Sequence, residues 1–282
     1  GVFKAGTPLI TTTPYVYEAF LKVHQLQPRD EWRNILESIV RHATTDIKDF
    51  KFSETASTCS YTPDDTGGIV NASAYRSFLL TSAAKFLDRD ELLEIAGRNL
   101  NFVLESQSAD GSWPYARDGV RDFVDHFHTC FVMKALAKSH SFTGEPRILN
   151  ALKRGVDYYL KNLFDEHGMP RPFSKAPRLT VYKCELYDWA ECINLCLLLQ
   201  NQFPAMEKTL ETVVSGICTD WVKPDGSFRS RKLIVGWDNV PMHRWAQSQM
   251  FRSLAFYLRE TQGSPATRVA RDGIPLGLGF RR

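Results

Sequence analysis

The segment CELYDWAECIN, residues 184–194, places acidic and aromatic side chains at helical spacing. Glu185, Asp188 and Glu191 follow one another at intervals of three, so two of them can share one helix face beside Tyr187. Paired carboxylates near aromatic rings suit glycoside chemistry, in which one carboxyl is the acid and the other the base or nucleophile. Solvated surface carboxylates are the alternative, but the leucines that follow are too apolar for an outer helix. We predict catalytic roles for Tyr187 and Asp188.

The densest polar cluster is DFVDHFHTC, residues 122–130. His126 and His128 point about 200° apart on a helix, so they cannot share a face or bind one metal ion together. One histidine is expected to face a cavity while the other packs or caps the helix. Histidine titrates near neutral pH and suits acid–base catalysis. We assign that role to His126, with Asp125 contacting the substrate; a hydrogen-bonded structural histidine is the alternative.

The segment RSRKLIVGWDNVPMHRWAQSQM, residues 229–250, combines cationic, aromatic and acidic side chains. Guanidinium groups bind carboxylate or sulfate well. An N-cap role for Asp238 is the structural alternative, and the two roles can coexist. We predict that Asp238 and His243 are catalytic. The predicted substrate contacts here are Arg229, Arg231, Trp237 and Arg244.

The segment STCSYTPDDTGGIVNASAYR, residues 57–76, offers a tyrosine, an asparagine and an arginine near one another. Such a set suits β-elimination from a uronic acid, because neutral or cationic groups stabilise the enolate while tyrosine or histidine moves the proton. We predict that Tyr61 and Asn71 contact the substrate.

Helical periodicity covers most of the chain, and no convincing alternating strand is present. Charged segments alternate with apolar ones whose first turns are polar, which predicts alternating outer and inner helices. The predicted helices are 14–27, 30–48, 70–88, 90–107, 122–140, 146–163, 183–202, 205–221 and 240–262.

A turn followed by an aromatic residue recurs along the chain. Gly111, Gly168 and Gly226 are 57 and then 58 residues apart, and the first lies in QSADGSWPY. A fixed period of helix pairs predicts an array of repeats. The long loops favour an all-α (α/α)6-type toroid over an open solenoid. Five inner helices are predicted, so an N-terminal segment or a partner would complete the ring. Trp113 and Tyr115 are predicted substrate contacts, and Trp113 is also a candidate wedge between helix pairs.

Composition limits the classes of function. The formal net charge of +3 is small for 282 residues and argues against nucleic-acid binding. No apolar run is long enough for a membrane span. The six cysteines form no C-x-x-C pair, which favours reduced core thiols. Phosphate-loop, dinucleotide and G-x-S-x-G motifs are absent, and we predict no cofactor and no metal. We expect one toroid domain over 1–262 and an irregular tail over 263–282; the compartment, cytoplasm or periplasm, stays open.

The segment QSADGSWPY resembles the Q-x-x-D-G-S-W segment of squalene-cyclase-like and prenyltransferase-like toroids. The wider pattern TPLITTTPYVYEAF, SYTP…VNASAYR, NLNFVLESQSADGSWPYA, DFVDHFHTCFVMKAL and GWDNVPMHRWAQSQMFRSL is similar to the VpsJ-like bacterial exopolysaccharide proteins over nearly the whole chain. This resemblance implies a toroid fold and a polysaccharide context, and it names no reaction.

Three functions are consistent with these patterns. The first is a lyase, glycoside hydrolase or epimerase that acts on a bacterial exopolysaccharide in the cavity of the toroid. The second is a non-catalytic glycan-binding or scaffold module of a polysaccharide assembly complex. The third is a terpenoid cyclase or prenyltransferase, which the polar inner-helix starts and the missing acidic motifs count against. We favour the first function, with a polysaccharide or oligosaccharide as the partner.

Overall fold

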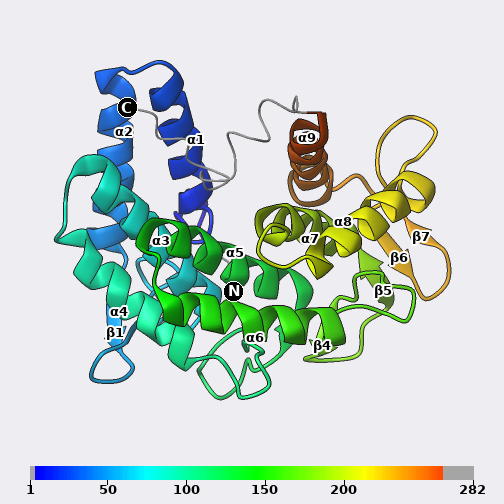
Figure 1. The fold of residues 1–282 in the computed structure, drawn as a ribbon, viewed down its shortest axis with the longest axis horizontal. Helices are drawn as coiled ribbons and strands as arrows, with labels where there is room; N and C mark the ends of the chain where they lie inside the picture. The colour runs from blue at the N-terminus through cyan, green and yellow to red at the C-terminus, as the bar shows by residue number, and fades with distance from the viewer. Residues whose placement is uncertain (1–3, 263–282) are drawn as a thin grey trace. The chain divides into compact units, whose positions relative to one another are not determined.

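Helices dominate the computed structural model, which describes residues 4–262 except for the side chains of Arg244 and Gln262. Figure 1 shows the order of the elements along the chain. The α-helices of this part are α1 (Thr13–Leu26), α2 (Asp30–Arg41), α3 (Val70–Leu87), α4 (Leu92–Glu105), α5 (His126–Thr143), α6 (Pro146–Asn162), α7 (Leu186–Leu199), α8 (Ala205–Gly216) and α9 (Ser248–Gln262).

Short strands and three π-helical turns complete the described part of the chain. The π-helical turns are η1 (His42–Asp46), η2 (Ile217–Trp221) and η3 (His243–Gln247). The strands are β1 (Asp49–Lys51), β2 (Ser57–Cys59), β3 (Val124–Asp125), β4 (Phe173–Lys175), β5 (Tyr182–Glu185), β6 (Arg231–Leu233) and β7 (Trp237–Asp238). They pair antiparallel as β1–β2, β3–β4 and β5–β6–β7.

The predicted alternation of inner and outer helices is confirmed for α3–α4 and α7–α8, whereas the predicted inner helices α1 and α9 bury only a few of their side chains. Helices α3 and α7 are buried along nearly their whole length, whereas α4 and α8 bury one stripe of apolar side chains. This contrast follows from composition, because α3 and α7 consist mainly of alanine, serine, leucine and cysteine, while one face of α4 carries glutamate and arginine and one face of α8 carries glutamate and lysine. The apolar helices therefore form the interior of each unit described below.

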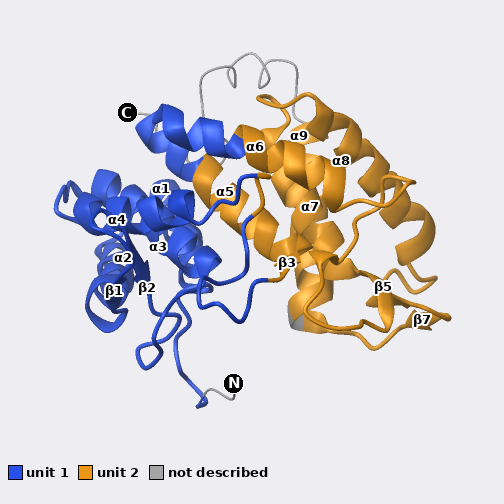
Figure 2. Ribbon diagram, turned by 90° about the horizontal axis from the view of Figure 1, so that it is seen from below, with its two compact units in different colours: residues 1–109, 113–122, 138–152 blue, residues 110–112, 123–137, 153–282 orange. Residues whose placement is uncertain are grey.

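The described chain divides into two compact units, which Figure 2 colours separately. Unit 1 comprises residues 1–109, 113–122 and 138–152, and unit 2 comprises residues 110–112, 123–137 and 153–282. Both α5 and α6 contribute residues to each unit. The single domain over 1–262 stays a prediction, and the predicted tail over 263–282 lies outside the described residues. No helix of the described part is long and apolar enough to cross a membrane.

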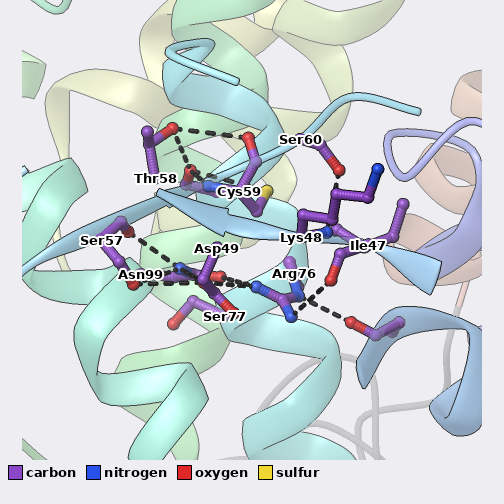
Figure 3. A network of polar contacts seen from close by, with 12 residues as sticks. Ile47, Lys48, Asp49, Ser57, Thr58, Cys59, Ser60, Arg76, Ser77 and Asn99 are labelled. Atoms are coloured by element: carbon purple, nitrogen blue, oxygen red, sulfur yellow. Dashed lines mark hydrogen bonds and ion pairs between the residues drawn. The ribbon is translucent and has the colours of Figure 1, made fainter. Parts of the chain in front are cut away.

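In unit 1, a buried arginine joins four segments of the chain (Figure 3). The fully buried Arg76 of α3 donates hydrogen bonds to the carbonyl oxygens of Ala43 (2.7 Å) and Ile47 (3.2 Å). It also donates to Oδ1 of Asp49 (2.7 Å) and to Oδ1 of Asn99 on α4 (3.1 Å). These bonds compensate the guanidinium for the loss of water. Arg76 thus has a structural role, and the segment 57–76 does not present it to a cavity.

The three glycine joints of the repeat share one local geometry. Gly111, Gly168 and Gly226 all have φ in the left-handed region, between 76° and 94°, which favours glycine. At the first and third joints, the preceding aspartate accepts a hydrogen bond from the backbone amide two residues further on: Asp110 from Ser112, and Asp225 from Ser227. The repeated turn predicted from the sequence is confirmed at all three positions.

Three inner helices begin later than the sequence predicts. Helices α5, α7 and α9 start at residues 126, 186 and 248, instead of 122, 183 and 240. The missing turns are replaced by β3, β5 and the β7–η3 segment, whose backbone groups are satisfied by strand pairing. These strands are two to four residues long, too short to produce a visible alternation in the sequence.

Cysteine pairing agrees with the sequence-based prediction. All six cysteines are free thiols, and Cys59, Cys130, Cys192 and Cys196 are buried.

Candidate functional site

Unit 2 contains a cavity of about 530 Å³, a volume typical of sites for small ligands. It lies where β3 meets α5 and β5 meets α7, and the loop 176–181 and η3 complete its walls. The lining residues are Phe123, Asp125, Phe127, His128, Phe173, Pro177, Arg178, Leu179, Thr180, Val181, Tyr182, Glu185, Tyr187, Arg231, Met242 and Trp245.

A carboxylate and an imidazole form a close pair in this cavity. Asp125 ends β3 and caps α5, because its Oδ1 atom accepts the backbone N–H of His128 at 3.0 Å. Its second oxygen, Oδ2, lies 2.6 Å from Nδ1 of the His128 ring. The cap therefore fixes the ring as well as the helix start. A carboxylate that orients an imidazole in this way is typical of a proton-transfer dyad.

Glu185 and Arg231 form a second pair of charged side chains in the cavity lining. Glu185 ends β5, and Arg231 lies opposite it on β6. The Nε and Nη2 atoms of Arg231 both donate to Oε1 of Glu185, at 3.0 and 2.8 Å. The same guanidinium lies 5.3 Å from the centre of the Tyr182 ring. Strand pairing thus brings Arg231 to Tyr182 and Glu185, although Arg231 lies 46 residues after Glu185 in the sequence.

Burial raises the pKa of two groups, Tyr182 in the cavity lining and Asp188 next to the lining residue Tyr187. Burial, reinforced by the negative charges of Glu185 and Asp188, raises the pKa of Tyr182 to about 12. Burial also raises the pKa of Asp188 well above its usual value, with further contributions from Glu185 and Asp125. At neutral pH Tyr182 therefore keeps its hydroxyl proton and can donate a hydrogen bond, and the buried Asp188 holds its proton to a higher pH than an ordinary aspartate does.

Aromatic rings form the largest part of the cavity wall. Tyr187 lies 5.1 Å from Phe127 and 5.6 Å from Trp245, measured between ring centroids. Trp245 is 53% exposed, although it is a large aromatic side chain. Rings with one apolar face toward solvent can stack on other flat or partly apolar rings, and the apolar faces of sugars are of this kind.

Three of the predicted site residues line the cavity: Asp125, Tyr187 and Arg231. Two others, His126 and Asp188, are fully buried and do not line it. His126 is fully buried, with Nδ1 3.1 Å from the Arg171 carbonyl oxygen and Nε2 2.6 Å from the Tyr159 hydroxyl. Asp188 is also fully buried. The catalytic roles of His126 and Asp188 stay predictions, and neither residue belongs to the lining.

The predicted residues of segment 229–250 surround β6 and β7. Arg229 lies 5.0 Å from the Trp237 ring centre and donates to Oδ1 of Asn239 at 3.3 Å. Asp238 accepts the backbone N–H of Val240 at 2.9 Å, and His243 is exposed. These side chains do not belong to the lining, and the side chain of Arg244 lies outside the described residues.

The predicted residues Tyr61, Asn71, Trp113 and Tyr115 belong to unit 1. Tyr61 accepts a hydrogen bond from the Thr11 hydroxyl at 2.9 Å, and Asn71 is buried. Trp113 is 2% exposed and donates from its ring N–H to the Val103 carbonyl. The ring of Tyr115 lies 5.5 Å from the Arg121 guanidinium carbon. The contacts of Trp113 favour the wedge role over the substrate role.

Several lining residues are not among the predicted ones, namely Arg178, Tyr182, Glu185, Trp245 and His128. The i, i+2 argument correctly separates the two histidines of 122–130, but the one in the cavity is His128. An aspartate three residues before a histidine at a helix start is the local signal for a cap that also holds the ring. The pairing of Glu185 with Arg231 has no local signal, because strand pairing across 46 residues creates it.

Among the described residues, no group of three or more His, Cys, Asp or Glu side chains could hold a metal ion.

Comparison with known proteins shows similarity in fold. No protein-family model matches the sequence, and no curated protein matches it. The structure is similar to the GH76 α-mannanase of Bacteroides thetaiotaomicron (TM-score 0.70, 12% identity, 92% of this chain and 71% of that chain). It is also similar to cellobiose 2-epimerase from Bacillus thermoamylovorans (0.67, 12%, 92% and 78%) and to a polysaccharide lyase (0.64, 9%, 88% and 73%). The chain has an all-α fold of the (α/α) toroid class, as predicted.

Proposed function

We propose that this protein is a carbohydrate-active enzyme that transfers a proton to or from a glycan in the cavity of unit 2. The observation that carries the proposal is the Asp125–His128 pair, which lines the same cavity as Tyr187 and Trp245. The imidazole is the acid or base, Asp125 orients it, and the aromatic rings hold the sugar. The resemblance to VpsJ-like proteins supports a bacterial exopolysaccharide as the source of the glycan.

The charge arrangement favours epimerisation or β-elimination over hydrolysis. Hydrolysis needs two carboxyl groups that act on the glycosidic bond, one of them protonated. Of the two lining carboxylates, Asp125 is paired with His128 and Glu185 is bonded to Arg231. Asp188, whose pKa is raised by burial, is not part of the lining. A histidine, a protonated tyrosine and an arginine suit proton abstraction next to a carbonyl or carboxylate. The structural neighbours include an epimerase, a polysaccharide lyase and a glycoside hydrolase, so the choice between these reactions rests on the lining residues.

The experiment measures exchange and product formation on a panel of bacterial exopolysaccharides and their oligosaccharides. In D₂O, epimerisation introduces deuterium at the carbon that loses its proton, and β-elimination gives an unsaturated sugar that absorbs ultraviolet light. New reducing ends without either signal would indicate hydrolysis and contradict the proposal. We expect His128→Gln and Asp125→Asn each to reduce turnover by about 10²–10⁴-fold. His167→Gln is the matched control, since His167 is exposed in unit 2 and does not line the cavity.

Glycan binding without catalysis is the second candidate function. It is favoured by the Glu185–Arg231 ion pair, because a carboxylate tied to an arginine is typical of a structural role. A protein of this kind would bind an oligosaccharide, lose binding on Trp245→Ala, and produce no exchange or new product with any member of the panel.

A further inference from the structure

The loop 176–181 connects β4 to β5 and forms one wall of the cavity. Five of its six residues line the cavity, from Pro177 to Val181. The loop is fixed at its end, because the backbone N–H of Ile234 donates to the Val181 carbonyl at 3.1 Å. Arg178 lies near the middle of this wall and is exposed. A cation is thus positioned at the cavity by a segment bonded to the β6–β7 turn.

Among the described lining residues, Arg178 is a cation without an ion-pair partner. Asp125 pairs with His128, and Glu185 pairs with Arg231. Arg178 forms no ion pair or hydrogen bond with any residue of the described range 4–262. The guanidinium of Arg178 is therefore available to pair with an anionic group of a ligand in the cavity. A guanidinium group presents a planar fork of donors that matches a carboxylate or a sulfate.

We propose that Arg178 binds an oxyanion carried by the glycan, so that the substrate is an acidic polysaccharide or oligosaccharide. This inference rests on the proposed function, because it concerns the ligand of the same cavity. The aromatic rings bind the sugar through its apolar face, and Arg178 selects sugars that carry a carboxylate or sulfate. Because Arg178 and His128 line the same cavity, a carboxylate bound by Arg178 would lie in the same cavity as the imidazole. Proton abstraction from the carbon next to a carboxylate requires the two groups to be close.

Binding of matched ligands tests this inference by titration calorimetry. The probes are hexamers of galacturonate, glucuronate and mannuronate, the methyl ester of each hexamer, and a sulfated and a neutral hexamer of one hexose. Esterification removes the charge and keeps the sugar. We expect at least one acidic hexamer to bind about tenfold more tightly than its neutral counterpart, with an affinity that falls as salt rises. The uronate and sulfate arms identify which oxyanion is recognised.

Two variants, each lacking one positive charge, show whether Arg178 causes the preference for acidic hexamers. Arg178→Gln is expected to remove the tenfold preference for the acidic hexamer and to leave binding of the neutral form unchanged. Lys183→Gln is the control, because Lys183 is exposed on β5 and does not line the cavity. Equal binding of acidic and neutral forms, no binding of any acidic hexamer, or an unchanged preference in Arg178→Gln would overturn the inference.

The variant Trp245→Ala shows whether only the acidic specificity is wrong or the proposed enzymatic function is wrong as well. If neutral glycans bind and react in a manner that depends on Trp245 and His128, the enzyme proposal stands and only the acidic specificity falls. If no glycan binds and Trp245→Ala changes nothing, both proposals fall.

Discussion

Replacing Asp188 with asparagine should change the pH dependence of stability in a defined direction. The side chain of Asp188 is fully buried. Burial raises the pKa of Asp188 well above the ordinary 3.8, and the charges of Glu185 and Asp125 raise it further, while the Phe127 backbone acts weakly against them. The native state therefore retains a proton that the unfolded chain releases.

The sign and size of the effect follow from proton binding. Between the ordinary pKa and the raised one, the native state binds more protons than the unfolded state, so stability falls as pH rises. For one group the loss is about 1.4 kcal/mol per pH unit. Asparagine has nearly the same shape and cannot ionise. Asp188→Asn should match the parent protein near about pH 4 and exceed its free energy of unfolding by a growing margin toward neutral pH.

Urea unfolding at a series of pH values measures this margin. Asp118→Asn is the control of opposite sign. Partial burial alone would raise the pKa of Asp118. The backbone amides of Arg121 and Val120, together with the Arg121 guanidinium, have the opposite effect and lower the pKa to about 2. Removing the Asp118 carboxylate should slightly destabilise the protein above that pKa, and the difference should vanish toward about pH 2. A margin for Asp188→Asn that does not change with pH would mean that Asp188 is ionised in the native protein, and the argument would be wrong.

Two further predictions concern the joint at 107–115. Trp113→Ala should lower the free energy of unfolding by about 3–5 kcal/mol, because it empties a buried site and leaves the Val103 carbonyl without its donor; kcat/KM of the folded protein should change less than twofold, and a large loss of activity at unchanged Tm would contradict the wedge role. Gly111→Ala should destabilise far more than Gly226→Ala in thermal unfolding. Both glycines have positive φ, which costs an alanine about 1–2 kcal/mol. Only at Gly111 would the new Cβ lie 2.3 Å from the Arg154 carbonyl oxygen. Equal losses of stability in the two variants would show that this contact relaxes freely.

The fold could be predicted from the sequence because its signals are local and repeated. The glycine joints need φ values that few other residues adopt, and apolar and charged helices alternate along the chain. Strands could not be predicted, because β3 and β7 have two residues each and owe their conformation to partners elsewhere in the chain. Arg76 illustrates the same limit in unit 1. Its partner Asp49 is 27 residues away, so the sequence does not reveal that the guanidinium is buried.

The candidate site could be predicted to the level of the segment but not of the residue. Segments 122–130 and 184–194 both supply cavity residues, and Asp125 and Tyr187 were expected there. The choice between His126 and His128 depends on where the helix begins. If α5 began at 122, as the periodicity indicates, Asp125 would lie inside the helix and could not cap it. Because α5 begins at 126, Asp125 caps the helix and its side chain reaches His128.

The two strand-to-helix junctions of unit 2 explain why the charges of the site gather in one cavity. At each junction the last strand residue is an acid, Asp125 before α5 and Glu185 before α7. A helix N-terminus carries partial positive charge and favours a carboxylate at this position. Each acid contacts a basic side chain. Asp125 contacts His128 of the helix that it caps, and Glu185 contacts Arg231 of the neighbouring strand. Asp188 lies only three residues after Glu185, and there burial outweighs the helix terminus. The full burial of Asp188, in contrast to Glu185, which lines the cavity, thus explains the strongly raised pKa of Asp188.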